Sequence, residues 1–240
     1  MNNYLSFGGG VNSVALHLLM LKEKVDFEAI FIDHATDWPE TYTYLGMFQE
    51  WLKNEGHKSI TVLKPNVEGF SSLYDYLWHY KMIPSFRLRF CTDKFKVRVV
   101  QQYVSTPCFM MLGIDAGEKK RAKISIKNGI ENRFPLIEYD IDRDGCKKII
   151  KDHGLPIPIK SGCYICPFQR VIQWRDLRRN KPDLFCKARK LEERATRFRV
   201  ERGKTPVNIS ASNKKLSLLV GEDQMTLFKQ DEYPPCQCGL

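Results

Sequence analysis

The sequence predicts an α/β protein with a doubly wound, mostly parallel sheet and a C-terminal, cysteine-containing and largely helical extension. Short apolar runs typical of buried strands alternate with helical patterns through the first part of the chain. The proline-rich segment Leu155–Pro158 then precedes a cysteine pair and an arginine-rich helical stretch. We therefore expect two parts, residues 1–158 with the sheet and residues 159–240 with the cysteine pair and basic helices.

The first strand leads into a loop that indicates anion binding. Tyr4-Leu-Ser6 is a short apolar piece typical of a strand, and Gly8-Gly-Gly10 follows it. Glycine adopts positive φ and carries no Cβ. Residues 13–21 are apolar almost all round, as in a helix buried against a sheet. A strand, a glycine loop and a buried helix point backbone amides at an anion. A tight structural turn is the alternative for the glycines alone.

Three further strands are expected at residues 28–33, 60–63 and 108–114. After the first of them, Thr36 or Asp37 is expected to cap a helix that has Pro39 in its first turn. Ligands of parallel sheets bind at the carboxyl ends of the strands. Both the glycine loop and Asp33 lie at such ends.

Composition narrows the class of protein. The chain has 240 residues and a formal charge of +10, which favours a polyanionic partner without choosing among nucleic acid, nucleotide and sulfate. No run reaches the roughly 20 apolar residues of a membrane span, and the first residues do not resemble a secretory signal. We expect a cytoplasmic protein with no membrane partner. Its eight cysteines favour thiol, metal or redox chemistry over a disulfide scaffold.

Four motifs in the first half of the chain resemble one known family. Gly8-Gly-Gly-Val-Asn-Ser13 resembles the Ser-Gly-Gly-x-Asp-Ser pyrophosphate loop of the PP-loop superfamily. Segment 33–41 resembles the Asp-Thr-Gly-x-x-x-Pro-Glu-Thr motif of its phosphoadenylyl-sulfate (PAPS) reductase branch. Segment 89–96 resembles Arg-x-Cys-Thr-x-x-x-Lys, and segment 113–122 resembles Gly-Ile/Val-x-x-x-Glu-x-x-Arg-Ala of that branch. Together, and in this order, the motifs are fairly specific.

The resemblance implies a Rossmann-like, adenine nucleotide alpha-hydrolase-like sheet that binds ATP or PAPS. Loop amides would hold phosphate or sulfate, Asp33 would lie near ribose or adenine, and guanidinium or ammonium groups would neutralise the phosphates. Asn12 replaces the usual aspartate and loses its charge, so Mg²⁺ handling and ATP cleavage are less expected than nucleotide binding. The alternative for each cation singly is a solvated surface charge. The implied nucleotide-binding residues are Ser6, Gly8, Gly9, Gly10, Asn12, Ser13, Asp33, Arg89, Lys96 and Arg121.

Cys163 and Cys166 have the spacing of a metal or cluster half-site. Two buried apolar cysteines are the alternative. The resemblance implies a distant third ligand, for which Cys91 is the first choice. We expect a 4Fe–4S cluster, with zinc as the alternative. The candidates for the fourth ligand are Cys146, Cys186, Cys236 and Cys238, of which Cys236 is the one we predict.

The chain ends in Cys236-Gln-Cys-Gly-Leu240. This tail resembles the Cys-Gly-Leu-His tail of sulfonucleotide reductases, although the histidine is missing. The match predicts Cys238 as a catalytic nucleophile, with Cys91 as the second catalytic candidate. A flexible end without a role is the alternative.

An arginine-rich stretch follows the cysteine pair. Within residues 187–199, Leu191, Ala195 and Phe198 recur on one helical face, and cations occupy the rest. This pattern predicts a nucleic-acid surface or, alternatively, an exposed helix with Glu–Arg pairs. Trp174 and Phe168 are expected to stack on bases or to pack in the core.

Three functional hypotheses follow. The first is nucleotide-activated sulfur transfer to a nucleic acid, with a sulfur donor as partner. The second is a PAPS-reductase-like enzyme that releases sulfite with the help of a thioredoxin-like reductant. The third is a non-catalytic nucleotide-binding factor with a structural metal knuckle.

Overall fold

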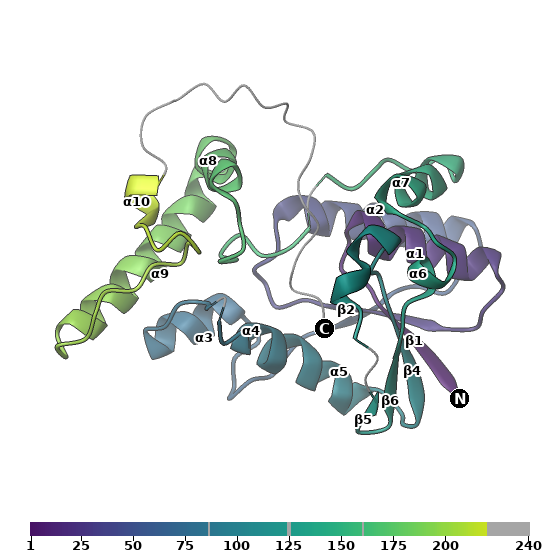
Figure 1. The fold of residues 1–240 in the computed structure, drawn as a ribbon, viewed down its shortest axis with the longest axis horizontal. Coiled ribbons are helices and arrows are strands. Elements are labelled where there is room, and N and C mark those ends of the chain that lie inside the picture. Colours follow the sequence, from purple (N-terminus) through teal and green to yellow (C-terminus); the bar gives the residue numbers. More distant parts are fainter. Residues whose placement is uncertain (86, 124–125, 160, 220–240) are drawn as a thin grey trace.

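The computed structural model describes residues 1–85, 87–123, 126–159 and 161–219. A six-stranded sheet lies at one end of the molecule, and an arm of helices lies at the other (Figure 1). The strand order is β3-β2-β1-β4-β6-β5. The strands are β1 (Asn2–Ser6), β2 (Glu28–Ile32), β3 (Thr61–Leu63), β4 (Cys108–Leu112), β5 (Ile126–Lys127) and β6 (Ile130–Arg133).

All neighbouring strands pair in parallel except β5 and β6, which are antiparallel. The four strands expected from the sequence are confirmed. β5 and β6 were not expected, because they are short and carry few apolar residues. β1 pairs with β2 on one side and with β4 on the other, so the strand order reverses at β1. The carboxyl end of β1 is therefore the point where such sheets bind ligands.

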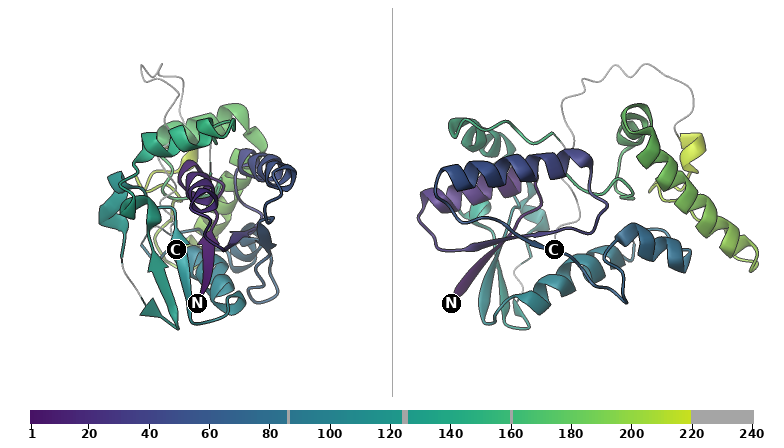
Figure 2. Two further views of the ribbon diagram at one scale, coloured as in Figure 1. Left: turned by 90° about the vertical axis from the view of Figure 1, so that its right-hand side faces the viewer. Right: turned by 180° about the vertical axis from the view of Figure 1, so that it is seen from behind.

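Helices cover both faces of the sheet (Figure 2). Alternate residues of β1 point to opposite faces, so Leu5 joins the core beneath α1, α2 and α7 while Tyr4 joins the core beneath α5. Because both faces are buried, the central strands are nearly continuous apolar runs. The helices of this part are α1 (Val11–Lys22), α2 (Pro39–Asn54), α3 (Leu73–Tyr80), α4 (Phe90–Thr92), the π-helical η1 (Asp93–Val97), α5 (Arg98–Tyr103), the 3-10 helix η2 (Ala116–Arg121), α6 (Pro135–Glu138) and α7 (Arg143–Asp152).

The C-terminal extension is helical, as the sequence predicts. It consists of α8 (Val171–Asn180), α9 (Pro182–Val200) and α10 (Leu216–Leu219). Its core includes the fully buried Trp174, which is therefore a packing residue and is not available to stack on a base. Leu77 of α3 and Phe95 of η1 belong to the same core. The helical arm is thus packed on elements of the first part of the chain.

One predicted detail is wrong. Trp38 occupies the position before α2, where Thr36 or Asp37 was expected, and Pro39 begins the helix as predicted. The Thr36 hydroxyl and the Asp37 carboxylate instead contact His34. No helix in the described ranges is long and apolar enough to cross a membrane.

Candidate functional site

The glycine loop joins the central strand β1 to α1, at the reversal point of the sheet. Gly9 has φ +68°, and a Cβ there would lie 2.9 Å from Thr41 Cγ2. The Ser13 hydroxyl accepts a hydrogen bond from the Gly10 N–H (3.2 Å) and donates one to the Gly10 carbonyl (3.0 Å). A Cβ on Gly8 would meet no heavy atom within 4 Å. The loop is thus braced at Gly9 and Gly10 and bare at Gly8, where an anion has room beside the first turn of α1.

Asn12 faces other side chains of the protein. Its Nδ2 donates to Asp115 Oδ2 (2.8 Å), and its Oδ1 accepts from Arg143 Nη1 (3.1 Å). Asn12 and Asp115 are both buried. An aspartate at position 12 would place a second carboxylate against Asp115 in a poorly hydrated site. Repulsion between the two carboxylates is therefore a reason for asparagine at position 12, where the resembled motif has aspartate.

Asp33 lies at the carboxyl end of β2, as predicted. Its Oδ1 accepts hydrogen bonds from the Ala35 N–H (3.0 Å) and from the Tyr42 hydroxyl (2.9 Å). Burial and the neighbouring carboxylates of Asp37 and Asp33 raise the pKa of Tyr42, so its hydroxyl stays protonated and donates. One oxygen of Asp33 is thus engaged in shaping the loop that leads to α2.

The cysteine pair forms a knuckle that docks on this same loop. The Trp38 N–H donates to the Gly162 carbonyl (3.0 Å), and the Tyr164 N–H donates to the Thr36 carbonyl (2.9 Å). Gly162 has φ 107°, which favours glycine there. The Cys166 N–H turns back to the Cys163 carbonyl (3.1 Å). These bonds fix the knuckle beside the carboxyl end of β2.

Three of the predicted sulfur residues line one pocket. Cys163 and Cys166 come from the knuckle, and Cys91 comes from α4. The pocket has a volume of about 30 Å³, and Arg89, Lys96 and His34 also line it. We call it the thiol pocket. Burial raises the pKa of the Cys91 thiol, although Lys96 opposes this effect. Cys236 and Cys238 lie outside the described residues.

Lys96 is the central cation of the thiol pocket. It lies in the π-helical turn η1, directly after the α4 turn that contains Cys91, and such turns are frequent at functional sites. Burial alone would lower the pKa of Lys96, but the negative charges of Asp37 and the three pocket cysteines raise it. The ammonium is therefore charged. Lys96 was expected to contact nucleotide phosphates, and in the structure it lines the thiol pocket.

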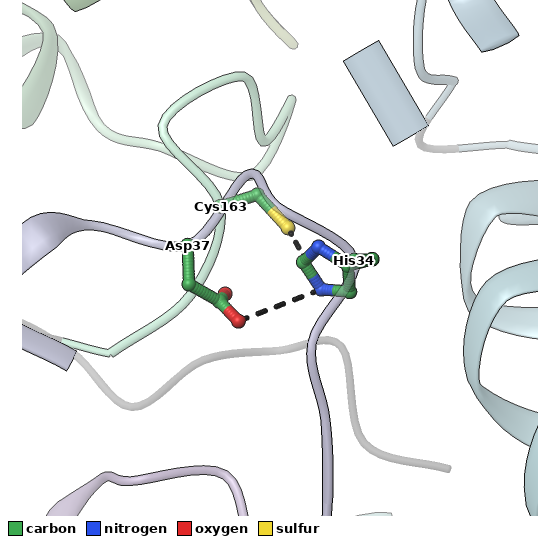
Figure 3. A group of neighbouring side chains, drawn as sticks. All are labelled: His34, Asp37 and Cys163. Carbon is green, nitrogen blue, oxygen red and sulfur yellow. Dashed lines mark hydrogen bonds and ion pairs between the residues drawn. The ribbon is translucent and has the colours of Figure 1, made fainter. Parts of the chain in front are cut away.

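His34, Asp37 and Cys163 form a compact group at one side of this pocket (Figure 3). His34 Nε2 lies 3.6 Å from Asp37 Oδ2 and 3.6 Å from Cys163 Sγ. Burial lowers the pKa of His34, but Cys163 and Asp37 outweigh this and raise it. Sequence analysis missed His34 as a site residue, because 129 positions separate it from Cys163. The only signal was its place within a resembled motif.

A second, larger pocket lies on the face of the sheet covered by α5. Its volume is about 580 Å³, within the range of small-molecule sites. Apolar side chains of β4 and β6 form part of its wall, including Met110 and Leu112. Arg89 lines both this pocket and the thiol pocket. The cations around the larger pocket are Arg89, Lys120, Arg121, Lys123 and Lys127, and Arg121 pairs with Glu118.

The basic arm, formed by α8 and α9, shows features of both interpretations, the nucleic-acid surface and the exposed helix with Glu–Arg pairs. Arg189 pairs with Glu193 at 3.7 Å, as expected for an exposed helix. Arg194 lies over the ring of Trp78 at 4.5 Å. Phe198 is covered by the cations of Lys81 and Arg202, so its ring face is already occupied. The arm thus presents cations and few free aromatic faces.

Comparisons with known proteins add a similarity of fold. No family model matches the sequence, and no curated protein matches it. Among solved structures, the crystal structure of phosphoadenylyl-sulfate (PAPS) reductase from Candida auris, in a phosphate complex, superposes with a TM-score of 0.49 and 18% sequence identity. The match covers 68% of this chain and 81% of that chain.

Proposed function

We propose that the chain is an enzyme that binds an adenine nucleotide at the glycine loop and carries out sulfur chemistry at the thiol pocket. The observation that carries this proposal is the position of the knuckle between the two. A Cβ on Gly10 would lie 2.5 Å from Ser161 Oγ, while Cys163, two residues later, lines the thiol pocket. A group bound at the loop therefore lies close to the segment that carries the thiols.

The nucleotide part of the proposal rests on backbone geometry. The bare side of the loop at Gly8 and the start of α1 provide amides and a favourable dipole for phosphate or sulfate. Arg89 and Arg121 line the larger pocket, where they would neutralise anionic groups. ATP and PAPS both have an apolar base and an anionic tail, which suits such a site. The remaining predicted contacts, Ser6 and Asp33, border the same edge of the sheet.

The reaction favoured is nucleotide-activated sulfur transfer to a nucleic acid. A base carbonyl oxygen attacks the α-phosphate of ATP, and pyrophosphate leaves. A persulfide on one pocket cysteine, loaded by an external sulfur donor, then attacks the activated carbon, and AMP leaves. A second pocket cysteine attacks the first cysteine's own sulfur and breaks the S–S bond. The thiolated base is released, and an external dithiol reduces the new disulfide. The positive arm and the presence of several thiols support this scheme.

A PAPS-reductase-like reaction is the second candidate. A cysteine thiolate would attack the sulfate sulfur of PAPS, the nucleotide bisphosphate would leave, and a dithiol partner would then reduce the S-sulfocysteine and release sulfite. The cation-lined larger pocket supports it, since PAPS carries more negative charge than a simple sulfate ester. The predicted nucleophile Cys238 lies outside the described residues, and the other predicted nucleophile, Cys91, lines the thiol pocket.

The expected iron–sulfur cluster has limited support in the pocket. Among the described residues, three cysteines line the pocket, whereas a 4Fe–4S cluster is usually held by four thiolates, and the predicted fourth ligand Cys236 lies outside those residues. The sulfur chemistry is accordingly assigned to the thiols themselves. A non-catalytic factor with a structural metal knuckle is the third candidate, because the knuckle is held by backbone bonds on both sides.

Product analysis under reducing, anaerobic conditions tests these candidates. Release of AMP and pyrophosphate from ATP that depends on added transfer RNA or DNA supports sulfur transfer. Release of sulfite from PAPS with thioredoxin supports the reductase. Gly8→Val should abolish either reaction by filling the anion space, and Gly46→Ala on the exposed face of α2 is the matched control. Absence of both products, with nucleotide still bound, would leave the non-catalytic factor.

A further inference from the structure

Three side chains of different chemistry converge on the His34 side of the thiol pocket. His34 offers an imidazole nitrogen, Asp37 a carboxylate oxygen and Cys163 a sulfur, and these atoms all lie within 4.8 Å of one another. Asp37 and Cys163 face each other across an isolated antiparallel bridge, so the backbone fixes their positions. His34 and Asp37 are buried. Two of the three side chains are therefore shielded from water, and Cys163 is half-buried.

The distance between His34 and Asp37 is longer than a hydrogen bond between nitrogen and oxygen, whereas the contact between His34 and Cys163 is within hydrogen-bond range for sulfur. An N–H···O bond spans about 2.7–3.2 Å, whereas His34 Nε2 and Asp37 Oδ2 are 3.6 Å apart. Two ligands of one tetrahedral zinc ion lie about 3.4–3.6 Å apart, given Zn–N and Zn–O distances near 2.0–2.2 Å and a Zn–S distance near 2.3 Å. The observed spacings of 3.6 Å to Asp37 Oδ2 and to Cys163 Sγ match that value. The two atom pairs that involve His34 are thus spaced as ligands of a shared ion, and all three atoms lie within 4.8 Å of one another.

The second nitrogen of His34 is already occupied. Its Nδ1 lies 2.8 Å from the Thr36 hydroxyl, and Thr36 is fully buried. Metal-binding histidines use the second ring nitrogen in this way, which fixes the orientation of the ring and leaves the first nitrogen for the ion. The hydrogen bond thus directs Nε2 toward Asp37 and Cys163.

From this geometry we infer that His34, Asp37 and Cys163 bind a single divalent cation of the zinc class, with the fourth position open to water, which leaves Cys91 and Cys166 for the proposed sulfur chemistry. Both cysteines line the same pocket. The ion and the Lys96 ammonium together bring three positive charges. The Asp37 carboxylate, the Cys163 thiolate and one further thiolate balance them. This site does not depend on the proposed nucleotide reaction.

The test uses the full chain, freed of metal by a chelator under anaerobic, reducing conditions and titrated with Co²⁺ as a spectroscopic probe. One equivalent should bind with a sulfur-to-cobalt charge-transfer band and the intense visible bands of a tetrahedral site, and Zn²⁺ should displace it. His34→Ala should weaken binding at least about 100-fold. Asp37→Asn should weaken it, and Cys163→Ser should reduce the charge-transfer band. Cys186→Ser, outside the pocket, is the matched control and should match the wild type.

X-ray absorption at the zinc edge of the wild-type protein decides the question without any variant. Mixed nitrogen or oxygen and sulfur neighbours support the proposal. Sulfur neighbours alone, iron with acid-labile sulfide, or no stoichiometric metal would overturn it, as would His34→Ala protein that folds and binds Co²⁺ like the wild type. The Gly8→Val protein should keep the metal, so loss of nucleotide binding and loss of metal are separate results.

Discussion

The buried His17 lowers the free energy of unfolding of this protein at acid pH. It lies in α1 with its side chain fully enclosed, and the rings of Phe7, Phe27 and Phe48 surround it at centroid distances of 6.0, 4.9 and 5.2 Å. Its Nδ1 has no hydrogen-bond partner among the residues that the structure describes. Burial, with a smaller contribution from His57, lowers the pKa of His17 to about 3. The folded state therefore holds this imidazole neutral.

The sign and size of the effect follow from that pKa. The unfolded chain takes up a proton at His17 near pH 6.5, whereas the folded chain does so only near pH 3. Between these values the unfolded state binds more protons, so the free energy of unfolding falls as pH falls. The slope is about 1.4 kcal/mol per pH unit well inside the window, with an upper limit of about 5 kcal/mol over its full width.

Replacement of His17 by leucine, which has a similar volume and no proton to bind, isolates this effect. We expect the free energy of unfolding of His17→Leu, measured in urea from pH 7 to pH 4, to fall about 2–3 kcal/mol less than that of the wild type. His79→Gln, which changes an exposed histidine, should follow the wild-type curve. If the His17→Leu and wild-type curves run parallel across this range, the burial argument is refuted.

Four further outcomes are expected. Gly8→Val should weaken ATP or PAPS binding at least about 10-fold by calorimetry with an unchanged circular dichroism spectrum, since the added side chain enters open space. Asn12→Asp should lower the free energy of unfolding by about 1–3 kcal/mol, because it removes the donor to Asp115; a stable variant would contradict this. Glu192→Gln should cost a similar amount, because the carboxylate accepts the N–H groups of residues 209 and 216; unchanged urea midpoints would argue against it. Gly46→Ala should raise the stability by about 0.5–1 kcal/mol, because the position is helical, exposed and free of contacts; a loss would contradict this.

The sequence predicts the central part of the fold well, because local patterns decide it. The strands β1, β2, β3 and β4 are short apolar runs, and burial on both faces makes such runs continuous. β6 escapes prediction because Ile130 is its single buried residue, and β5 because neither of its residues is buried. The helix cap of α2 is mispredicted for another reason: Thr36 and Asp37 have capping side chains, but His34 engages both.

The site is predictable only in part, because its geometry is non-local. The convergence of Cys91 with Cys163 and Cys166 was expected through the resemblance, and the structure brings the three to one pocket. The position of Lys96 was not predictable, because it depends on the π-helical turn η1. One extra residue in a helical turn rotates every later side chain, and no propensity rule marks where such a turn forms.

The π-helical turn also explains why so many charges meet in one small pocket. Phe95 within it is fully buried in the core shared with the helical arm, so η1 cannot slide back into regular α-helix without exposing that ring. The adjacent Lys96 is thereby held among Asp37 and the thiols, where burial of an ammonium is tolerated only next to negative charge. Packing of the arm on η1 thus fixes the electrostatics of the thiol pocket, and the arm and the sheet act on the site as one unit.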